Sequence, residues 1–397
     1  MPGFEHFGEE ERKEVLDVLE TGVLFRYGFD QARKGHWKAK MFESELSKRI
    51  AATYCHLCSS GTAALTVALA SCGIGAGDEV IIPPFTFVAT MEAVLYAGAI
   101  PVFADIDQTL CLDPDAIEPA VSSRTKAVVP VHMCGSMARI KEIKDICLQK
   151  HLILIEDACQ ALGASCDGKY AGTFGHAGCF SFDPVKTITC GEGGAMVTDH
   201  REIYETAAGF ADHGHDHIGN DRGLEGHPIL GGNFRISELN AAVGVAQLHK
   251  LDRFLETQRT NKKSLKDALS RFPDITFREI PDENGDSATF LSFLLPDEDR
   301  ARRIAAELAG AGVDGCFYWF DNNWHYLRNW EHLRGLKSPA PLALSLLKRT
   351  PDYEHLQLPK SDQIIARTIS MLIKLSWTES DLSQRIDAMT RVLKANL

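Results

Sequence analysis

An acidic side chain and a lysine are the residues of this sequence best placed to do chemistry together. Asp157 ends a largely apolar run that begins at Leu152, and Lys186 stands between the apolar segment Cys179–Phe182 and a glycine-rich turn at 191–194. A carboxylate at the end of a buried strand can keep a pyridine nitrogen protonated, and an amine shielded from solvent can carry an aldehyde as a Schiff base. The pair therefore predicts chemistry based on pyridoxal 5'-phosphate (PLP), with Asp157 and Lys186 as the catalytic residues.

Weaker signals surround this pair, and each also has an ordinary structural explanation. Gly61 and Thr62 lie where a helix is expected to begin, and the N–H groups of a helix start bind phosphate, although a capping hydroxyl explains the same pattern. Ser181 could supply another phosphate contact. Phe87 could stack on a flat ring or pack in the core. Gln160, about one helical turn after the acid, could reach the ring oxygen.

The elements that must position these side chains alternate between strands and helices. This pattern runs from about residue 55 to 200 and predicts an α/β fold with a mostly parallel sheet and helices on both faces. Binding sites in such sheets form beyond the carboxyl ends of the strands, where Asp157, His132 and Phe87 are expected. The expected strands are 79–82, 101–103, 127–131 and 152–156, and the expected helices are 63–70, 88–97 and 140–149.

The last third of the chain has a different pattern. Helical spacing over 236–255 predicts one amphipathic helix, continued by a second over 258–270. The remaining expected elements are strands at 276–280 and 288–295 and helices at 300–311 and 362–371. We therefore expect two domains, an N-terminal segment with a large cofactor-binding domain over 1–255 and a small α+β domain over 256–397.

Composition narrows the classes of partner and location. A formal net charge of −12 argues against nucleic acid or an anionic membrane as a partner. The first residues lack the basic and apolar stretches of a signal peptide, and no apolar run predicts a membrane span, so we expect a cytoplasmic protein. The 11 cysteines are scattered. Cys55 and Cys58 form the only close pair, which we interpret as a packed strand end rather than a metal site, and we predict no metal.

The ordered set of motifs resembles the DegT/DnrJ/StrS aminotransferases, a family of PLP-dependent sugar aminotransferases of fold type I. The resemblance runs from about residue 40 to the end of the sequence and implies a mostly parallel sheet between helices, with a smaller C-terminal domain. The matching stretches are Ser59–Leu65, Gly77–Thr90, Gly98–Asp107, Val131–Gly135, Ile155–Gly163, Phe180–Thr198, Asn233–Leu251 and, more loosely, Leu358–Trp377.

The resemblance also implies roles for single residues. Lys186 would be the Schiff-base lysine, Asp157 the partner of the ring nitrogen, Gln160 a contact of the ring oxygen and Phe87 the stacking residue. The phosphate would be held by Gly61, Thr62 and Ser181. Asn233 would reach the phosphate across a dimer interface, which implies a homodimer with shared active sites.

The expected reaction is a ping-pong transamination from glutamate to a keto-sugar. Related sugar dehydratases have a histidine in place of the lysine, so Lys186 favours transamination over deoxygenation, while Asp183 stands where many relatives have histidine or tyrosine. A closer resemblance within the family, carried by Met1–Gly8, Gly35–Lys40 and the loop Cys316–Tyr326, implies a keto-sugar acid of lipopolysaccharide synthesis as the acceptor. The alternatives are a nucleotide-linked 3-keto or 4-keto sugar, a PLP lyase or dehydratase, and a non-catalytic PLP-binding regulator.

Three segments leave their roles open. Basic residues in the N-terminal segment could be solvated or could meet an anionic substrate. The loop Asp212–His217 carries alternating histidines that are more typical of substrate or solvent contact than of metal binding. The aromatic loop Cys316–Tyr326 could be core or a wall that binds a sugar. The basic residues are Arg26, Arg33, Lys34, Lys38 and Lys40.

Overall fold

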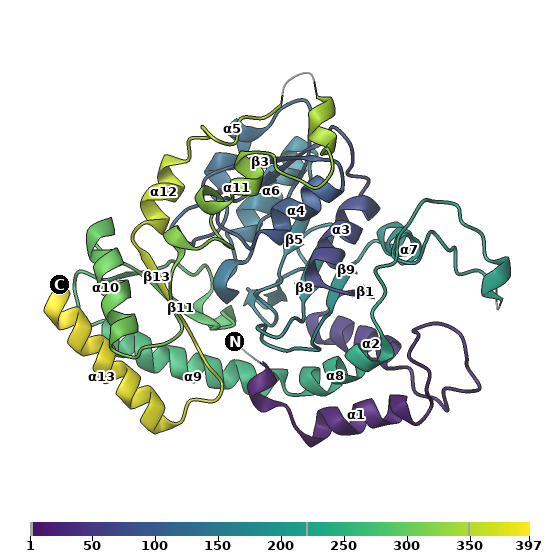
Figure 1. The fold of residues 1–397 in the computed structure, drawn as a ribbon, viewed down its shortest axis with the longest axis horizontal. Helices are drawn as coiled ribbons and strands as arrows, with labels where there is room; N and C mark the ends of the chain where they lie inside the picture. Colours follow the sequence, from purple (N-terminus) through teal and green to yellow (C-terminus); the bar gives the residue numbers. More distant parts are fainter. Residues whose placement is uncertain (1–2, 220, 348–349) are drawn as a thin grey trace.

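The computed structural model describes residues 3–219, 221–347 and 350–397, and its centre is a seven-stranded sheet (Figure 1). Its strands are β1 (Tyr54–Cys58), β2 (Glu79–Ile82), β3 (Ile100–Phe103), β4 (Thr125–Val128), β5 (Ile153–Asp157), β8 (Ala177–Ser181) and β9 (Gly194–Thr198). They lie in the order β1-β9-β8-β5-β4-β2-β3. Each neighbouring pair from β8 to β3 is parallel, and only β9 runs against both of its neighbours. The predicted α/β fold is confirmed.

Helices cover both faces of this sheet because successive strand residues point to opposite sides. Ile81 and Val128 pack in a core with α2, α6 and α8, whereas Val80 and Ala127 pack in a second core with α3, α4 and α7. The strands are therefore buried on both sides, as continuous apolar runs predict. These helices are α2 (Lys38–Ile50), α3 (Gly61–Ser71), α4 (Ala89–Tyr96), α6 (Ile140–Lys150), α7 (Arg201–Phe210) and α8 (Glu238–His249).

A second, antiparallel sheet forms the small domain. Its strands are β10 (Thr276–Phe277), β11 (Phe290–Leu294), β12 (Cys316–Tyr318) and β13 (Thr368–Leu372), in the order β10-β11-β13-β12. The helices beside it are α9 (Leu251–Leu269), α10 (Glu298–Gly310) and α13 (Glu379–Asn396). Along α9, Phe254 packs in the core of the large domain and Leu265 in the core of the small one. We therefore propose that the boundary between 1–255 and 256–397 lies within this helix.

Two predicted elements of the C-terminal part were wrong in detail. The single helix expected over 236–255 is two helices, because α8 ends at His249 and α9 begins at Leu251. Lys250 lies between them, and its Nζ donates to the buried Glu11 at 2.7 Å. The helix expected over 362–371 ends at Ile365, since the following segment contains β-branched residues and pairs as β13 between β11 and β12.

The N-terminal turn joins two distant parts of the chain. Gly3 N donates to the carbonyl oxygen of Lys186 at 3.1 Å, and Glu5 Oε2 accepts from the backbone N–H groups of Leu375 and Ser376 at 2.9 and 2.8 Å. The helix after this turn packs on α8. The remaining elements are α1 (Glu9–Leu19), α5 (Ile117–Ala120), α11 (Glu331–Arg334), α12 (Pro359–Ile365), β6 (Ser165–Cys166) and β7 (Lys169–Tyr170).

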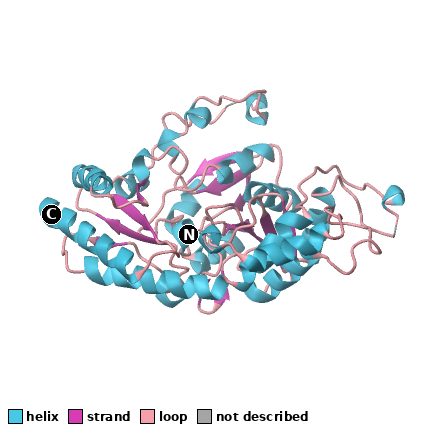
Figure 2. Cartoon of the chain, turned by 60° about the horizontal axis from the view of Figure 1, so that its bottom comes forward, coloured by secondary structure: helices cyan, strands magenta, loops and turns pink. Residues whose placement is uncertain are grey.

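Two loops project from the compact body on the same side, one after α1 and one between α7 and α8 (Figures 1 and 2). Cys55 and Cys58 lie buried in β1, as predicted for a packed strand, and all 11 cysteines are free thiols. Within the described ranges, no group of His, Cys, Asp or Glu side chains could hold a metal ion. No helix in the same ranges is long and apolar enough to cross a membrane.

Candidate active site

The carboxyl end of β5 presents two acids in opposite directions. Glu156 is fully buried and accepts hydrogen bonds from the backbone N–H groups of Gly172 and Gly175 at 2.9 and 2.8 Å, while His132 Nε2 lies 2.9 Å from it. These contacts hold Glu156, and with it His132, inside the fold. Asp157, the next residue, points to the other side and lines a cavity of about 370 Å³. The alternation of a strand therefore leaves only one of the two carboxylates available for chemistry.

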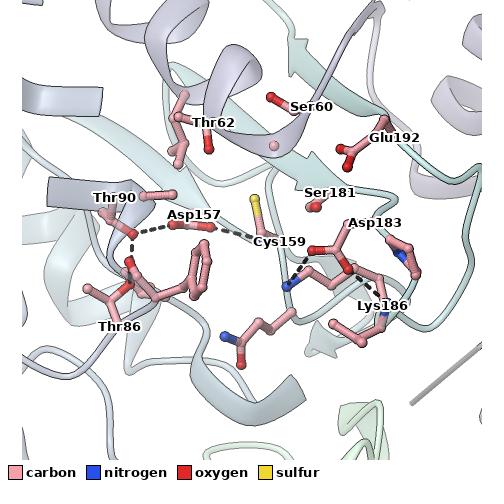
Figure 3. A pocket seen from close by; sticks show the side chains of 18 residues that line it. Ser60, Thr62, Thr86, Thr90, Asp157, Cys159, Ser181, Asp183, Lys186 and Glu192 are labelled. Atoms are coloured by element: carbon pink, nitrogen blue, oxygen red, sulfur yellow. Dashed lines mark hydrogen bonds and ion pairs between the residues drawn. The ribbon is translucent and has the colours of Figure 1, made fainter. Parts of the chain in front are cut away.

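The Asp157 carboxylate is held by neutral donors. Thr90 Oγ1 donates to Asp157 Oδ2 at 2.7 Å, the backbone N–H of Cys159 donates to Oδ1 at 3.1 Å, and Thr86 Oγ1 lies 2.7 Å from Thr90 Oγ1 (Figure 3). Among the described residues, no Lys, Arg or His forms an ion pair with this carboxylate. A buried carboxylate that is oriented but not neutralised is suited to receive a cationic N–H group.

Lys186 reaches the same cavity from the loop after β8. Its backbone N–H donates to the Asp183 carbonyl at 3.1 Å, and its side chain is 11% exposed. The Nζ atom lies 3.9 Å from Asp183 Oδ2 and 5.9 Å from the centre of the Phe87 ring. The contact with Asp183 is too long for a hydrogen bond, so the amine stays available to react.

The start of α3 forms a cradle on a third side of the cavity. Ser60 Oγ accepts from the Ala63 N–H at 3.0 Å and caps the helix, whereas the N–H groups of Gly61 and Thr62 have no hydrogen-bond partner among the described residues. A Cβ atom at Gly61 would lie 2.7 Å from the Cβ atom of Ser181. Only glycine therefore lets Ser181 approach the helix start, where free N–H groups favour an anion.

The other predicted residues divide into two groups. Phe87 and Gln160 line the cavity, and Gln160 Oε1 accepts from the Cys134 N–H at 3.0 Å, which leaves the Gln160 amide free to donate. Asn233 does not line the cavity of its own chain. It is exposed and forms a bridge with Asp212 in the projecting loop before α8. Its predicted contact with the phosphate would therefore have to come from a second chain.

Sequence reasoning missed several residues of the cavity. Thr86 and Thr90 line the cavity, and their spacing of about one helical turn was a usable signal. Cys159 also lines the cavity, and burial, together with the Asp157 charge, raises the pKa of its thiol well above the usual value, so it stays protonated. Glu192 also lines the cavity.

The three open segments also have defined places. Of the basic residues in the N-terminal segment, Arg26, Arg33 and Lys38 are buried and paired within the chain, which excludes the solvated role for these three. In the histidine loop, His215 pairs with Glu225 at 2.7 Å and His217 stacks on Tyr27. The aromatic loop is split, because Trp319 and Tyr326 belong to the core whereas Trp324 is 61% exposed.

These residues fit PLP as a group. The uncapped N–H groups of α3 and the nearby Ser181 suit its phosphate, the Asp157 carboxylate suits a protonated ring nitrogen, and the Gln160 amide suits the ring oxygen. The free amine of Lys186 suits its aldehyde. The cavity thus combines an anion cradle, a carboxylate and an amine around one space.

Comparisons with known proteins agree with this reading of the cavity. The model of the DegT/DnrJ/EryC1/StrS aminotransferase family matches residues 6–390. An L-glutamine:2-deoxy-scyllo-inosose aminotransferase of Streptomyces kanamyceticus is 40% identical over 66% of this chain, which spans 61% of that relative's length. A GDP-perosamine synthase of Vibrio cholerae is 31% identical over 85% of this chain and 89% of its own. The crystal structure of NtdA from Bacillus subtilis, with the cofactor PMP bound, is also similar. The superposition covers 99% of this chain and 84% of the NtdA chain, with 27% identity and a TM-score of 0.81.

Proposed function

The chain belongs to the DegT/DnrJ/EryC1/StrS aminotransferase family, and from that premise we propose that it transfers an amino group from glutamate to a keto-sugar. Aminotransferases of this family depend on PLP, which acts as an electron sink and carries the amino group between the two substrates. Membership in a family of transferases favours catalysis over a PLP-binding regulator and over a lyase. The observation that carries the proposal is the single cavity shared by Lys186, Asp157 and the start of α3.

The side chains of the cavity have defined tasks in this proposal. Lys186 would hold the cofactor aldehyde and, as a free amine, would act as the base that takes the proton from the α-carbon of the amino donor. Asp157 would keep the ring nitrogen protonated, and Thr90 holds its carboxylate in place. Gln160 would donate to the ring oxygen and Phe87 would pack on the ring. Gly61, Thr62 and Ser181, which line the cavity, would bind the phosphate.

The second substrate is the less determined part of the reaction. We propose the keto-sugar acid 8-oxo-3-deoxy-manno-octulosonate, because the opening residues, Gly35–Lys40 and the aromatic loop resemble the 8-amino-3,8-dideoxy-manno-octulosonate transaminase. A nucleotide-linked keto-sugar is the second candidate. It is favoured by the similarity to the GDP-perosamine synthase and to a UDP-N-acetyl-3-dehydro-α-D-glucosamine 3-aminotransferase of Acidithiobacillus ferrooxidans, 41% identical over 51% of this chain.

We also propose a homodimer in the cytoplasm. Asn233 is exposed and does not line the cavity of its own chain, which suits a contact with the phosphate of a partner subunit. Free thiols at all 11 cysteines suit a reducing compartment. Mixing Lys186→Ala with Asn233→Ala chains tests the sharing of sites, because only a mixed dimer contains one intact site. Restored activity supports the dimer, and continued inactivity after exchange contradicts it.

Replacing the lysine tests the function itself. Lys186→Ala should lose the visible absorption of the lysine-bound cofactor and all measurable turnover, while Lys126→Ala, which removes an exposed lysine outside the cavity, should behave like the wild type. Glutamate should convert the wild-type protein to the spectrum of pyridoxamine phosphate. Persistent turnover in Lys186→Ala, or a wild type that glutamate leaves unchanged, would contradict an aminotransferase built on this amine.

A further inference from the structure

A large aromatic side chain stands uncovered next to the cavity. Trp324 is 61% exposed, whereas Trp319 and Trp330 are 2% and 0% exposed. Its ring stacks on Phe87 with the centroids 5.7 Å apart and an angle of 11° between the planes. The indole therefore packs on a side chain of the cavity wall and is itself exposed to solvent.

The backbone of Trp324 is held by hydrogen bonds to a distant segment. Val88 N donates to the Trp324 carbonyl at 2.9 Å and Thr86 N donates to the His325 carbonyl at 3.0 Å. These bonds attach the aromatic loop of the small domain to the segment that carries Phe87. An exposed tryptophan held in one place loses little freedom when a ligand packs on it, which favours binding.

His325 follows Trp324 in the chain, and its ring centroid lies 5.4 Å from that of Phe87. The Asn322 Oδ1 atom accepts from the Trp324 N–H at 3.0 Å and lies 2.9 Å from His325 Nδ1, so Nδ1 carries the hydrogen. Burial, and then the charge of Lys186, lowers the pKa of His325 to about 3. The imidazole is therefore neutral at physiological pH, with a lone pair on Nε2 that has no hydrogen-bond partner among the described residues.

We propose that Trp324 and His325 form the subsite of the sugar acceptor, in which the indole packs on the C–H face of a pyranose and His325 Nε2 accepts a hydrogen bond from one of its hydroxyl groups. This inference rests on the proposed function and deepens it. An aromatic face and a neutral acceptor suit a polyhydroxylated ring. Neither group is a cation that could pair with the carboxylates of glutamate, so the subsite serves only the half-reaction with the keto-sugar.

The two half-reactions separate this subsite from the rest of the site. In the PLP form, Trp324→Ala and His325→Phe should react with glutamate at rates within about twofold of the wild type. In the PMP form, Trp324→Ala should raise the KM for the acceptor by about tenfold, the worth of one good stacking contact, and Trp324→Phe should recover most of it. Tyr96→Ala is the matched control, since Tyr96 is 69% exposed and does not line the cavity.

The probes are 8-oxo-3-deoxy-manno-octulosonate and a UDP-linked 3-keto-sugar, and the one that the wild-type PMP form aminates is used for the variants. Its addition should also change the tryptophan emission of the wild type and not that of Trp324→Phe. An unchanged acceptor KM in Trp324→Ala would overturn the subsite and leave the proposed function intact. A wild type that reacts with glutamate but aminates neither sugar would overturn the acceptor class and the subsite together. A wild type that does not react with glutamate would overturn the proposed function.

Discussion

Two regions of this molecule concentrate ionisable side chains, and they treat charge in opposite ways. In the N-terminal segment, Arg26 pairs with Glu43 at 2.7 Å, and the fully buried Arg33 lies 3.4 Å from Glu238. In the cavity, the Asp157 carboxylate receives only neutral donors, and the nearest anion to the Lys186 amine is 3.9 Å away. A charge with a partner supplied by the fold supports the structure, whereas a charge oriented in a cavity without a close partner is available for chemistry.

The largest effect should come from removing the unpaired carboxylate. Asp157→Ala should lower kcat/KM by about 10³-fold, because it removes the group that stabilises charge in the transition state. Asp252→Ala removes an exposed carboxylate, paired with Arg49 on the surface, and should leave kcat/KM unchanged. Steady-state kinetics with glutamate and the chosen acceptor measure both variants. A loss of kcat/KM of less than tenfold in Asp157→Ala would contradict the idea that the unpaired carboxylate acts in catalysis.

A change in the paired region should affect stability rather than chemistry. Arg33→Met should lower the free energy of unfolding by about 3 kcal/mol, because it leaves the buried Glu238 carboxylate without its cation. Burial already raises the pKa of Glu238 and lowers that of Arg33, so the pair depends on both members. Urea unfolding monitored by circular dichroism gives the free energy. The folded variant should still be converted by glutamate at the wild-type rate, and a slower conversion would show that the pair also acts in catalysis.

A smaller effect should follow from loosening the carboxylate without removing it. Thr90→Val keeps the shape of the side chain but loses the hydrogen bond to Asp157, and should lower kcat about tenfold, as expected for a hydrogen bond to a charged group. Thr90→Ser, which restores the hydroxyl, should recover most of the rate. If the serine variant is as slow as the valine variant, packing rather than the hydrogen bond sets the effect.

The smallest predicted effect is a dependence of stability on pH in the paired region. Burial, and then the charges of Arg26 and His217, lowers the pKa of His56 well below 6.5. Below about pH 6.5 the unfolded chain therefore binds a proton at His56 that the folded chain does not bind. The free energy of unfolding falls as the pH drops below this value. His56→Gln should reduce that loss by about 1 kcal/mol between pH 6.5 and 5.5, measured by urea unfolding at each pH. An equal loss in the variant and the wild type would assign the pH dependence to other groups.

The sequence predicted the parts of the fold and site that depend on local pattern. Apolar runs located β2, β3, β4 and β5 of the large domain, whereas β9 was not predicted. Asp157 at the end of β5 and Lys186 in the loop after β8 line one cavity. The pairing of Thr90 with Asp157 joins residues 67 positions apart, so no periodicity within one segment could reveal it. The strand β13 was missed for the same reason, because its pairing with β11 and β12 outweighs local helical spacing.

The aromatic loop shows how far residue types alone can lead. Its composition suited both a core and a wall for a sugar, and the structure uses it for both. Trp319 donates to the Ser370 hydroxyl at 2.7 Å inside the small domain, whereas Trp324 faces outward beside Phe87. The two tryptophans are five positions apart, and only long-range contacts distinguish them: Trp319 packs among Phe85, Phe290 and Phe317, whereas the backbone of Trp324 pairs with Val88.

The N-terminal turn has a mechanical consequence. Gly3 forms a hydrogen bond with the backbone of Lys186, and Glu5, two residues later, forms hydrogen bonds with the backbone at 375–376. A hinge motion of the small domain would therefore displace the backbone of Lys186, because only residues 3–5 connect the two sets of hydrogen bonds. Substitutions at Gly3 or Glu5 should therefore affect the position of Lys186 as well as the local fold.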